Sequence, residues 1–391
     1  MLPERRAKLT EALAALSRRL ADDLRAKIRD EPEARARARA IYTDERVADD
    51  FIVWTDLLAR RAAVLWVLKS VYVRVLEDRG LLRPVRILDP ESQQLFARLA
   101  PNLGETAYLR WIYRDLASPT GGLPELFAPQ PAEVVNPSDT LSRALLDFWR
   151  TRDPDTGALA WRFTDEHFDG RLLGDLYQDL DPVVKERYAL LQTPEFIVDF
   201  ILDETLTPAL AEWGVETVRV IDPACGSGHF LLAVFKRLVR ALREKYPERP
   251  PRDVVRDVLA RVVGIDLNDY ACALARARLV MTALEACDES DLAKVSDLHP
   301  QVYWADALEQ VERDTPAQLT LQGVLLTDEV KPRATLTRPE VRAALRPIIQ
   351  KKFHVVVGNP PYITERDKAR KEYHREKVGK TQRYVSASGL Y

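Results

Sequence analysis

The chain has 391 residues, 46% hydrophobic and 30% charged, a composition typical of a globular protein with two or three domains. Its net charge of −2 excludes a protein that binds nucleic acid through an overall positive charge. No run of about 18 apolar residues occurs, and charges are spread over the first thirty residues, so we predict a cytoplasmic protein with no membrane partner. Three cysteines without CxxC spacing predict no metal site.

The first part of the chain, residues 1–184, has the sequence pattern of helices. Apolar residues recur at helical spacing over 1–40 and over 49–78, so each range is predicted to form one long helix. Pro32 weakens the first helix, and Gly80 fits the end of the second. Further helical patterns surround residues 95–99, 111–116 and 141–149. We therefore predict a mainly α-helical N-terminal region.

From residue 185 onward, apolar strand-like runs alternate with helical stretches. This alternation favours an α/β fold with a parallel, doubly wound sheet, and it defines a second domain over residues 185–391. The predicted strands are 218–221, 261–265, 301–304 and 353–357, and the predicted helices are 230–245 and 270–286. A helix is also predicted from Phe196, with Thr193 as its N-cap and Pro194 in its first turn. Residues 311–350 contain four prolines and are predicted to be a long inserted connection.

The first predicted strand of the sheet ends in an acid and is followed by a glycine-rich turn. Gly226 and Gly228 allow the backbone to approach a ligand closely, and a helix that opens at about His229 offers free N–H groups. A dinucleotide-binding fold uses the same arrangement, but its third glycine would stand where this chain has Leu231. Asp222 would also repel a pyrophosphate, whereas it suits a ligand that carries a cationic amine.

Two further acids follow the next two predicted strands. Asp266 comes directly after 261–265, where its oxygens can accept both hydroxyls of a ribose, and Asp306 follows 301–304. The carboxyl ends of parallel strands open onto a shared crevice. We therefore expect the three acids to converge on one binding site.

The segment Asn359-Pro-Pro-Tyr362 follows the last predicted strand. An exocyclic amine on an aromatic ring is planar and a poor nucleophile, and acceptors at its two N–H bonds draw it toward a tetrahedral, attacking form. The side-chain oxygen of Asn359 and the backbone oxygen of Pro360 are such acceptors, and Pro361 stiffens the loop. Tyr362 offers a ring on which a flipped-out base can stack. The pattern predicts catalysis by positioning and electrostatics.

A basic segment accompanies this motif. Residues 351–383 contain ten Lys or Arg against four Asp or Glu. Such an excess is typical either of a solvated charged face or of a segment that neutralises phosphates. Its position next to the acceptor motif favours the second interpretation.

Residues 185–391 resemble the catalytic core of gamma-type DNA adenine-N6 methyltransferases. Segments 188–202, 222–231 and 359–364 are most similar to the PglX-type methyltransferases of BREX phage-defence systems. The resemblance implies a Rossmann-like core that binds S-adenosyl-L-methionine. The cofactor-binding residues it implies are Thr193, Pro194, Asp222, Pro223, Ala224, Gly226, Gly228, Phe230, Asp266, Leu267, Asp306 and Ala307. The catalytic residues it implies are Asn359, Pro360, Pro361 and Tyr362.

The activity implied by the resemblance is site-specific methylation of adenine N6 in double-stranded DNA, with the target adenine flipped out of the duplex. The implied setting is a phage-defence or restriction-modification system with other defence proteins as partners. Members of the family continue with another catalytic motif and a target-recognition domain. This sequence stops at Tyr391, so we expect the catalytic core to be incomplete at its C-terminus.

Other functions remain open at this point. Protein-glutamine N5 methyltransferases also use Asn-Pro-Pro-Tyr on a planar amide nitrogen, but 137 residues separate Asp222 from Asn359 here, more than is usual in those enzymes. An RNA amino-methyltransferase is a further alternative, and cytosine N4 is an alternative acceptor. A chain that binds cofactor and DNA without turnover is the alternative from a different class.

Overall fold

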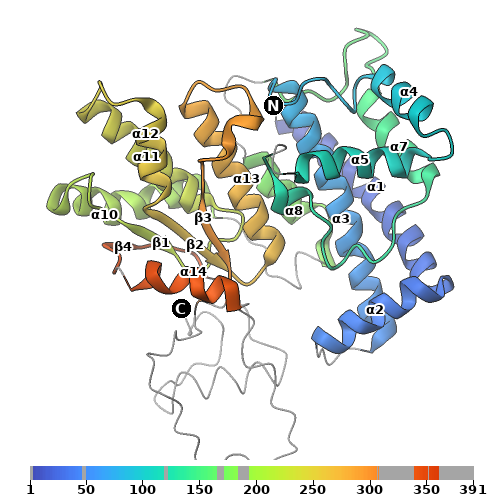
Figure 1. The fold of residues 1–391 in the computed structure, drawn as a ribbon, viewed down its shortest axis with the longest axis horizontal. Coiled ribbons are helices and arrows are strands. Elements are labelled where there is room, and N and C mark those ends of the chain that lie inside the picture. Colours follow the sequence, from blue (N-terminus) through green and yellow to red (C-terminus); the bar gives the residue numbers. More distant parts are fainter. Residues whose placement is uncertain are drawn as a thin grey trace, which may run out of the picture. The chain divides into compact units, whose positions relative to one another are not determined.

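A computed structural model describes residues 3–45, 50–118, 122–164, 171–183, 193–305, 307, 339–350 and 352–360. The chain divides into two compact units (Figure 1). The first comprises residues 1–192 and 280–299, and the second comprises residues 193–279 and 300–391. The domain boundary expected after residue 184 lies outside the described residues and stays a prediction. No described helix is long and apolar enough to cross a bilayer.

The first unit is helical and is built around α3 (Phe51–Asp78). This helix is buried along most of its length, and its first turn is capped by Asp50, whose carboxylate accepts a hydrogen bond from the Ile52 N–H at 2.8 Å. The helix predicted over 49–78 is thus confirmed. The unit also contains α1 (Pro3–Asp30), α2 (Pro32–Glu45), α4 (Pro90–Leu99), α5 (Glu105–Ala117), α6 (Pro124–Phe127), α7 (Asp139–Arg150), α8 (Arg171–Asp179) and the 3-10 helix η1 (Leu292–Val295).

The prediction of a single helix over residues 1–40 is wrong in one respect. The chain forms two helices there, α1 and α2, with Glu31 between them and Pro32 as the first residue of α2. Proline has no N–H and its ring clashes with the preceding turn, so it fits the start of a helix but not its interior. The same residue that weakens the first helix therefore begins the second.

The second unit is an α/β layer structure, as expected. Its described strands form a four-stranded parallel sheet in the order β3-β2-β1-β4. Its elements are α10 (Glu195–Trp213), β1 (Val220–Asp222), α11 (His229–Lys245), α12 (Pro251–Leu259), β2 (Val262–Asp266), α13 (Asp269–Ala286), β3 (Gln301–Trp304), α14 (Pro339–Ile349) and β4 (Val355–Val356). The residues of α13 after Leu279 group with the first unit.

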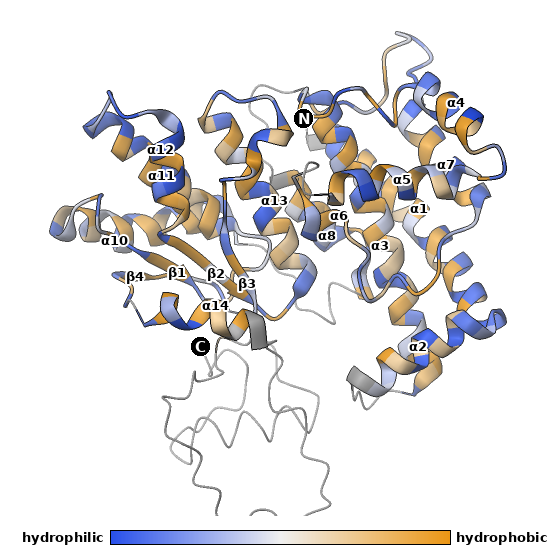
Figure 2. Ribbon diagram, in the orientation of Figure 1, coloured by the Kyte–Doolittle hydropathy of each residue, from blue (hydrophilic) through white to orange (hydrophobic). Residues whose placement is uncertain are grey.

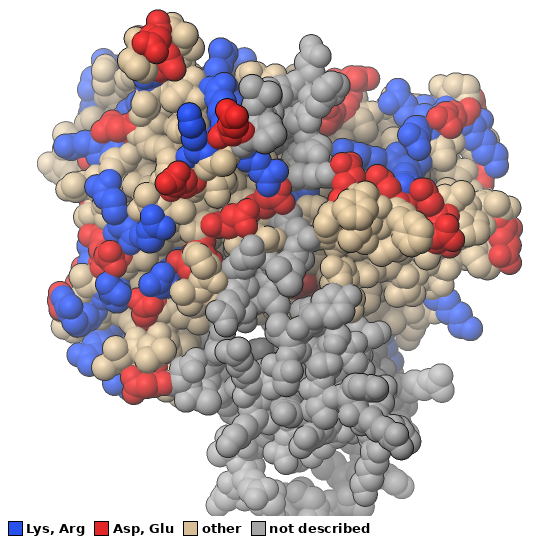
Figure 3. All heavy atoms as spheres, turned by 180° about the vertical axis from the view of Figure 1, so that it is seen from behind, with Lys and Arg blue, Asp and Glu red and all other residues tan. Residues whose placement is uncertain are grey.

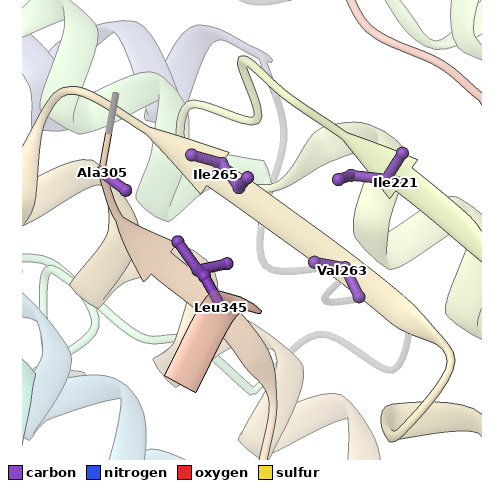
Figure 4. Close-up of a cluster of buried hydrophobic side chains, with 5 residues drawn as sticks. All are labelled: Ile221, Val263, Ile265, Ala305 and Leu345. Carbon is purple, nitrogen blue, oxygen red and sulfur yellow. The ribbon is translucent and has the colours of Figure 1, made fainter. Parts of the chain in front are cut away.

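Helices cover both faces of this sheet, because successive side chains of a strand point to opposite sides. On one face, Ile221, Val263 and Ile265 form a buried cluster with Ala305 and with Leu345 of α14 (Figure 4). The other face packs against α11. Figure 2 shows β1 and β2 mainly in hydrophobic colours, as a strand buried on both faces requires.

Helix α14 lies within the range predicted as an inserted connection. Residues 311–338 of that range are outside the described residues, but Pro339–Ile349 are helical. Pro339 stands at the first helical position, and Pro347 lies in the last turn. The first position suits proline, because the N–H that proline lacks has no partner inside the helix there. Pro347 lies inside the helix and removes one of its hydrogen bonds, so the helix forms in spite of this second proline.

Candidate functional site

The carboxyl ends of β2, β1 and β4 lie side by side at one edge of the sheet. Asp222, the last residue of β1, is in register with Gly264 of β2, and the Val357 N–H donates to the Ile221 carbonyl at 3.0 Å just beyond β4. Strands β2 and β3 lie on one side of β1, and β4 lies on the other. Ligands of open α/β sheets bind where the strand order reverses, which here is between β1 and β4.

The turn between β1 and α11 carries the predicted glycines. Gly228 has a φ of +89° and caps α11, which begins at His229 as expected. Gly226 has a φ of +50°, and apart from this glycine and its two chain neighbours no heavy atom lies within 4 Å of the place that a Cβ there would occupy. Both backbone conformations favour glycine. The open space beside Gly226 leaves room for a ligand close to the backbone.

A buried arginine on α13 forms hydrogen bonds with this turn. The Arg278 side chain, on α13, is 2% exposed, and its Nη1 donates to the Ser227 carbonyl at 2.6 Å and lies 3.2 Å from the Ser227 hydroxyl. Hydrogen bonds from a charged group to a backbone carbonyl are stronger than neutral ones. The guanidinium therefore fixes the turn in one conformation.

Two of the predicted acids meet beside the turn. The Asp222 carboxylate is 1% exposed and accepts a hydrogen bond from the Ala224 N–H at 3.0 Å. Asp266, at the end of β2, accepts from the Gly226 N–H at 2.7 Å and from the Asn268 N–H at 2.8 Å. Asp266 thus ties the glycine turn to the neighbouring strand.

The electrostatics of these acids suit a cationic ligand. Burial raises the pKa of Asp222 from 3.8 to about 8, the Ala224 N–H opposes this, and the nearby Asp266 carboxylate adds to it. Burial also raises the pKa of Asp266, against the lowering effect of its backbone hydrogen bonds. No cation among the described residues forms an ion pair with either carboxylate. A positively charged ligand would favour the ionised form of both carboxyl groups and lower their pKa.

The raised pKa of Asp222 predicts how stability changes with pH in the absence of ligand. The folded chain retains a proton between pH 4 and pH 8 that the unfolded chain has lost, because the pKa is 3.8 when unperturbed and about 8 when folded. The contribution to stability is therefore full below pH 4 and is lost as the pH rises through 8. We expect Asp222→Asn to flatten the fall in melting temperature between pH 5 and pH 8. Parallel curves for the two proteins would contradict this.

The predicted acceptor motif, which begins at Asn359, follows β4 at the same edge of the sheet. The side-chain amide of Asn359 donates from Nδ2 to the Thr193 hydroxyl at 3.2 Å, across 166 residues of sequence. Gly358 lies against Asp222: a Cβ at this glycine would stand 2.8 Å from the Asp222 Oδ1 atom. The end of β4 therefore brings Asn359 next to the buried acid of β1.

The contact between Gly358 and Asp222 predicts the effect of a single added methyl group. We expect Gly358→Ala to lower the free energy of unfolding by about 1 kcal/mol, the lower end of the usual cost of overpacking, because a carboxylate can give way slightly. Chemical denaturation measures this change. The same substitution in an Asp222→Ala background should cost less, because the clash is relieved. An equal cost in both backgrounds would rule out the contact as its cause.

The remaining predicted residues fall into four groups. Thr193 does not cap α10: Pro194 is the N-cap, and the Thr193 hydroxyl is bonded to Asn359 instead. Phe230 is buried at the start of α11, and Ala307 packs against the core cluster under α14. Pro223 and Pro360 are half-buried, and Leu267 is exposed. Asp306, Pro361 and Tyr362 lie outside the described residues, as do Lys351 and residues 361–383 of the basic segment.

Two residues of the site were missed by sequence reasoning. Gly358 had a usable signal, because it stands directly before the Asn-Pro-Pro-Tyr motif, where a close backbone approach requires a small residue. Arg278 had none, because an arginine in a helical pattern is normally assigned to the solvent face. Only the fold places it under the glycine turn.

The described residues contain no metal cluster, and one face of the molecule mixes its charges. Among the residues that the structure describes, no group of three or more His, Cys, Asp or Glu could hold a metal ion. Figure 3 shows Lys and Arg interspersed with Asp and Glu on the face seen from behind. Any concentration of positive charge for phosphate binding would therefore have to come from elsewhere than this face.

Comparison with known proteins agrees with the motifs. Residues 211–387 match the family model for the MmeI DNA-methyltransferase domain. The chain is 37% identical over 387 residues to adenine-specific methyltransferase PglX of Streptomyces coelicolor, covering 90% of this chain and 31% of the relative. It is 34% identical over 93 residues to adenine-specific methyltransferase BrxX of Escherichia coli O9:H4, covering 24% of this chain and 7% of that protein.

The chain thus spans about a third of the length of the PglX relative. A chain of the DrdV–DNA complex aligns with 99% of this chain and 33% of its own length, at 15% identity and a TM-score of 0.49. The expected resemblance to PglX-type methyltransferases is confirmed by the sequence relatives.

Proposed function

We propose that the chain carries the core of a site-specific DNA methyltransferase, on the basis of its similarity to the adenine-specific methyltransferase PglX and to the MmeI DNA-methyltransferase domain. The proposed reaction moves a methyl group from S-adenosyl-L-methionine to the N6 atom of an adenine in double-stranded DNA, with S-adenosyl-L-homocysteine as the leaving group and release of one proton from the methylated amine. We propose that it acts in the cytoplasm in a phage-defence or restriction-modification system, together with other defence proteins.

One observation carries this proposal: Asn359 at the end of β4 and Asp222 at the end of β1 lie on adjacent parallel strands, joined through the contact at Gly358. The first residue belongs to the predicted acceptor site and the second to the predicted cofactor site. A group-transfer enzyme needs its two substrates within reacting distance. The arrangement supports a reaction between two ligands that meet at β1 and β4.

The residues at the cofactor side fit S-adenosyl-L-methionine. When bound, this cofactor supplies a methyl group activated on a positively charged sulfur. Asp222 is the buried acid that would face positive charge, and Asp266 holds two backbone N–H groups while keeping lone pairs for the two ribose hydroxyls. Gly226 leaves the space into which such a ligand can extend. The roles of Asp306 and Ala307 at the adenine end stay predictions from the family resemblance.

The residues at the acceptor side fit an exocyclic amine. The Asn359 Oδ1 atom and the Pro360 carbonyl would accept hydrogen bonds from the two N–H groups of the adenine amine. These bonds would direct the lone pair of the amine nitrogen toward the methyl group. Tyr362 would stack on the flipped base, as the family resemblance implies. Positioning the amine in this way would carry most of the rate.

The test is methylation of unmethylated plasmid DNA by the purified chain with S-adenosyl-L-methionine, followed by mass spectrometry of the nucleosides. N6-methyladenine is the expected product, and N4-methylcytosine would correct the acceptor. RNA and a glutamine-containing peptide, tested in parallel, cover the other methyl acceptors. Cofactor binding by calorimetry without any transfer would support the alternative of a binding chain, and absence of both from folded protein would refute the methyltransferase assignment.

A further inference from the structure

The side-chain amide of Asn359 has a fixed partner. Its Nδ2 donates to the hydroxyl of Thr193, which is buried at 9% exposure and stands just before α10. The hydroxyl is not used to cap the helix, because Pro194 is the N-cap and no side-chain cap bond is formed. Threonine commonly caps helices, but the Thr193 hydroxyl instead accepts a hydrogen bond from a side-chain amide outside the helix.

The hydroxyl stands just before helix α10, which packs against β4. The helix packs on β4 and on α11, with Val198 and Leu202 buried beneath it. At the far end of the helix, the Trp213 ring lies 5.2 Å from the His354 ring, directly before β4. Helix and strand thus touch at both ends, through Trp213 and His354 at one and through Thr193 and Asn359 at the other.

The hydrogen bond to Thr193 engages the NH2 side of the Asn359 amide. An asparagine side chain has one acceptor oxygen and one donor NH2 group on opposite sides of the same carbon. With Nδ2 bonded to Thr193, Oδ1 is left for the other side. A half-turn of the amide would present donors to the amine of a base, which also carries only donors there, and the attack would lose its acceptor.

We propose that Thr193 is a positioning residue, whose hydroxyl fixes the Asn359 amide so that its oxygen faces the acceptor amine. This inference rests on the proposed function, because it assigns the oxygen its role in methyl transfer. It also replaces the expectation that Thr193 contacts the cofactor. Thr193 acts through Asn359 and need not touch either substrate.

Thr193→Val removes the hydroxyl but keeps the size and branching of the side chain, and Thr193→Ser keeps the hydroxyl as its matched control. We expect Thr193→Val to lower kcat about tenfold through loss of one hydrogen bond that orients the amide. The Kd for S-adenosyl-L-methionine should change less than twofold, and Thr193→Ser should restore most of kcat. A weakened cofactor Kd with unchanged kcat would overturn the proposal in favour of a cofactor contact.

A second readout does not depend on turnover. The chain has four asparagines, so asparagine-selective 15N labelling gives four side-chain NH2 groups, and Asn359→Ser identifies the one from Asn359. We expect its proton resonances to shift and its solvent exchange to speed up in Thr193→Val but not in Thr193→Ser. An unchanged amide signal in Thr193→Val would overturn the inference.

The two readouts separate this inference from the proposed function. In one outcome, the wild-type chain transfers no methyl group to DNA, but its Asn359 signal responds to Thr193→Val. The proposed function then fails, and the hydrogen bond has no catalytic role. If the wild type methylates DNA and Thr193→Val changes neither kcat nor the amide signal, the inference alone fails. A coupled loss of both supports it.

Discussion

Asn359→Ala should lower methyl transfer by roughly 10²–10³-fold, close to abolishing it, and leave cofactor affinity within about twofold. The side-chain oxygen of Asn359 is one of two acceptors proposed for the target amine, and it acts only as the amine changes shape during attack. Removing one preorganised polar group of this kind typically lowers kcat by roughly 10²–10³-fold. The cofactor side is built on β1 and β2, so its contacts do not depend on this side chain.

Single-turnover transfer to DNA and calorimetry with S-adenosyl-L-methionine, run on the same preparation, measure the two effects separately. Asn102→Ala is a matched control, because it makes the same substitution at an exposed residue of the first unit. Equal loss of transfer and of cofactor binding would count against the acceptor role of Asn359. It would show instead that the substitution disturbs the whole edge of the sheet.

Asp266→Ala should weaken cofactor binding by roughly 1–3 kcal/mol, the range for hydrogen bonds to a charged group. Two causes act together. The carboxylate is the proposed acceptor of the ribose hydroxyls, and it also holds the Gly226 N–H at 2.7 Å and the Asn268 N–H at 2.8 Å. Without it, the glycine turn keeps the hydrogen bond from the Cys225 N–H to the Ile265 carbonyl of β2 at 2.9 Å but loses the bond at Gly226, and the ligand must order that part of the turn when it binds.

Calorimetric Kd values for the wild type and Asp266→Ala give the change directly. Asp253→Ala is a suitable control, because this aspartate lies on α12 of the same unit with its side chain 53% exposed. An unchanged Kd in Asp266→Ala, with an unchanged melting temperature, would remove Asp266 from the cofactor site.

The parts of the site that the sequence predicted are those encoded locally. An acid at the end of an apolar run, followed by two glycines and a helical pattern, predicts β1, its turn and α11 from one short segment. The periodicity of two or about 3.6 residues is likewise visible in a single stretch of chain. Strands β1, β2 and β3 therefore lie within two residues of their predicted bounds.

The parts that could not be predicted depend on partners distant in sequence. Whether the Thr193 hydroxyl caps a helix or bonds an amide is decided by Asn359, which stands 166 residues later. The need for glycine at Gly358 comes from the buried Asp222 carboxylate across the strand pair. Helix α14 is stabilised by Leu345 packing on the sheet, a contact that local proline content does not reveal.

The position of β4 in the sheet also has a consequence for how the protein is made. Val355 pairs with Val220, which leaves the ribosome 135 residues earlier, whereas β1, β2 and β3 follow one another closely. The nascent chain can therefore assemble the cofactor side as soon as β3 emerges. Of the described strands, the one that precedes the acceptor motif is added last, at a sheet edge beside β1 that must stay unpaired in the meantime. Premature pairing of that edge with another chain would exclude Asn359 from its place.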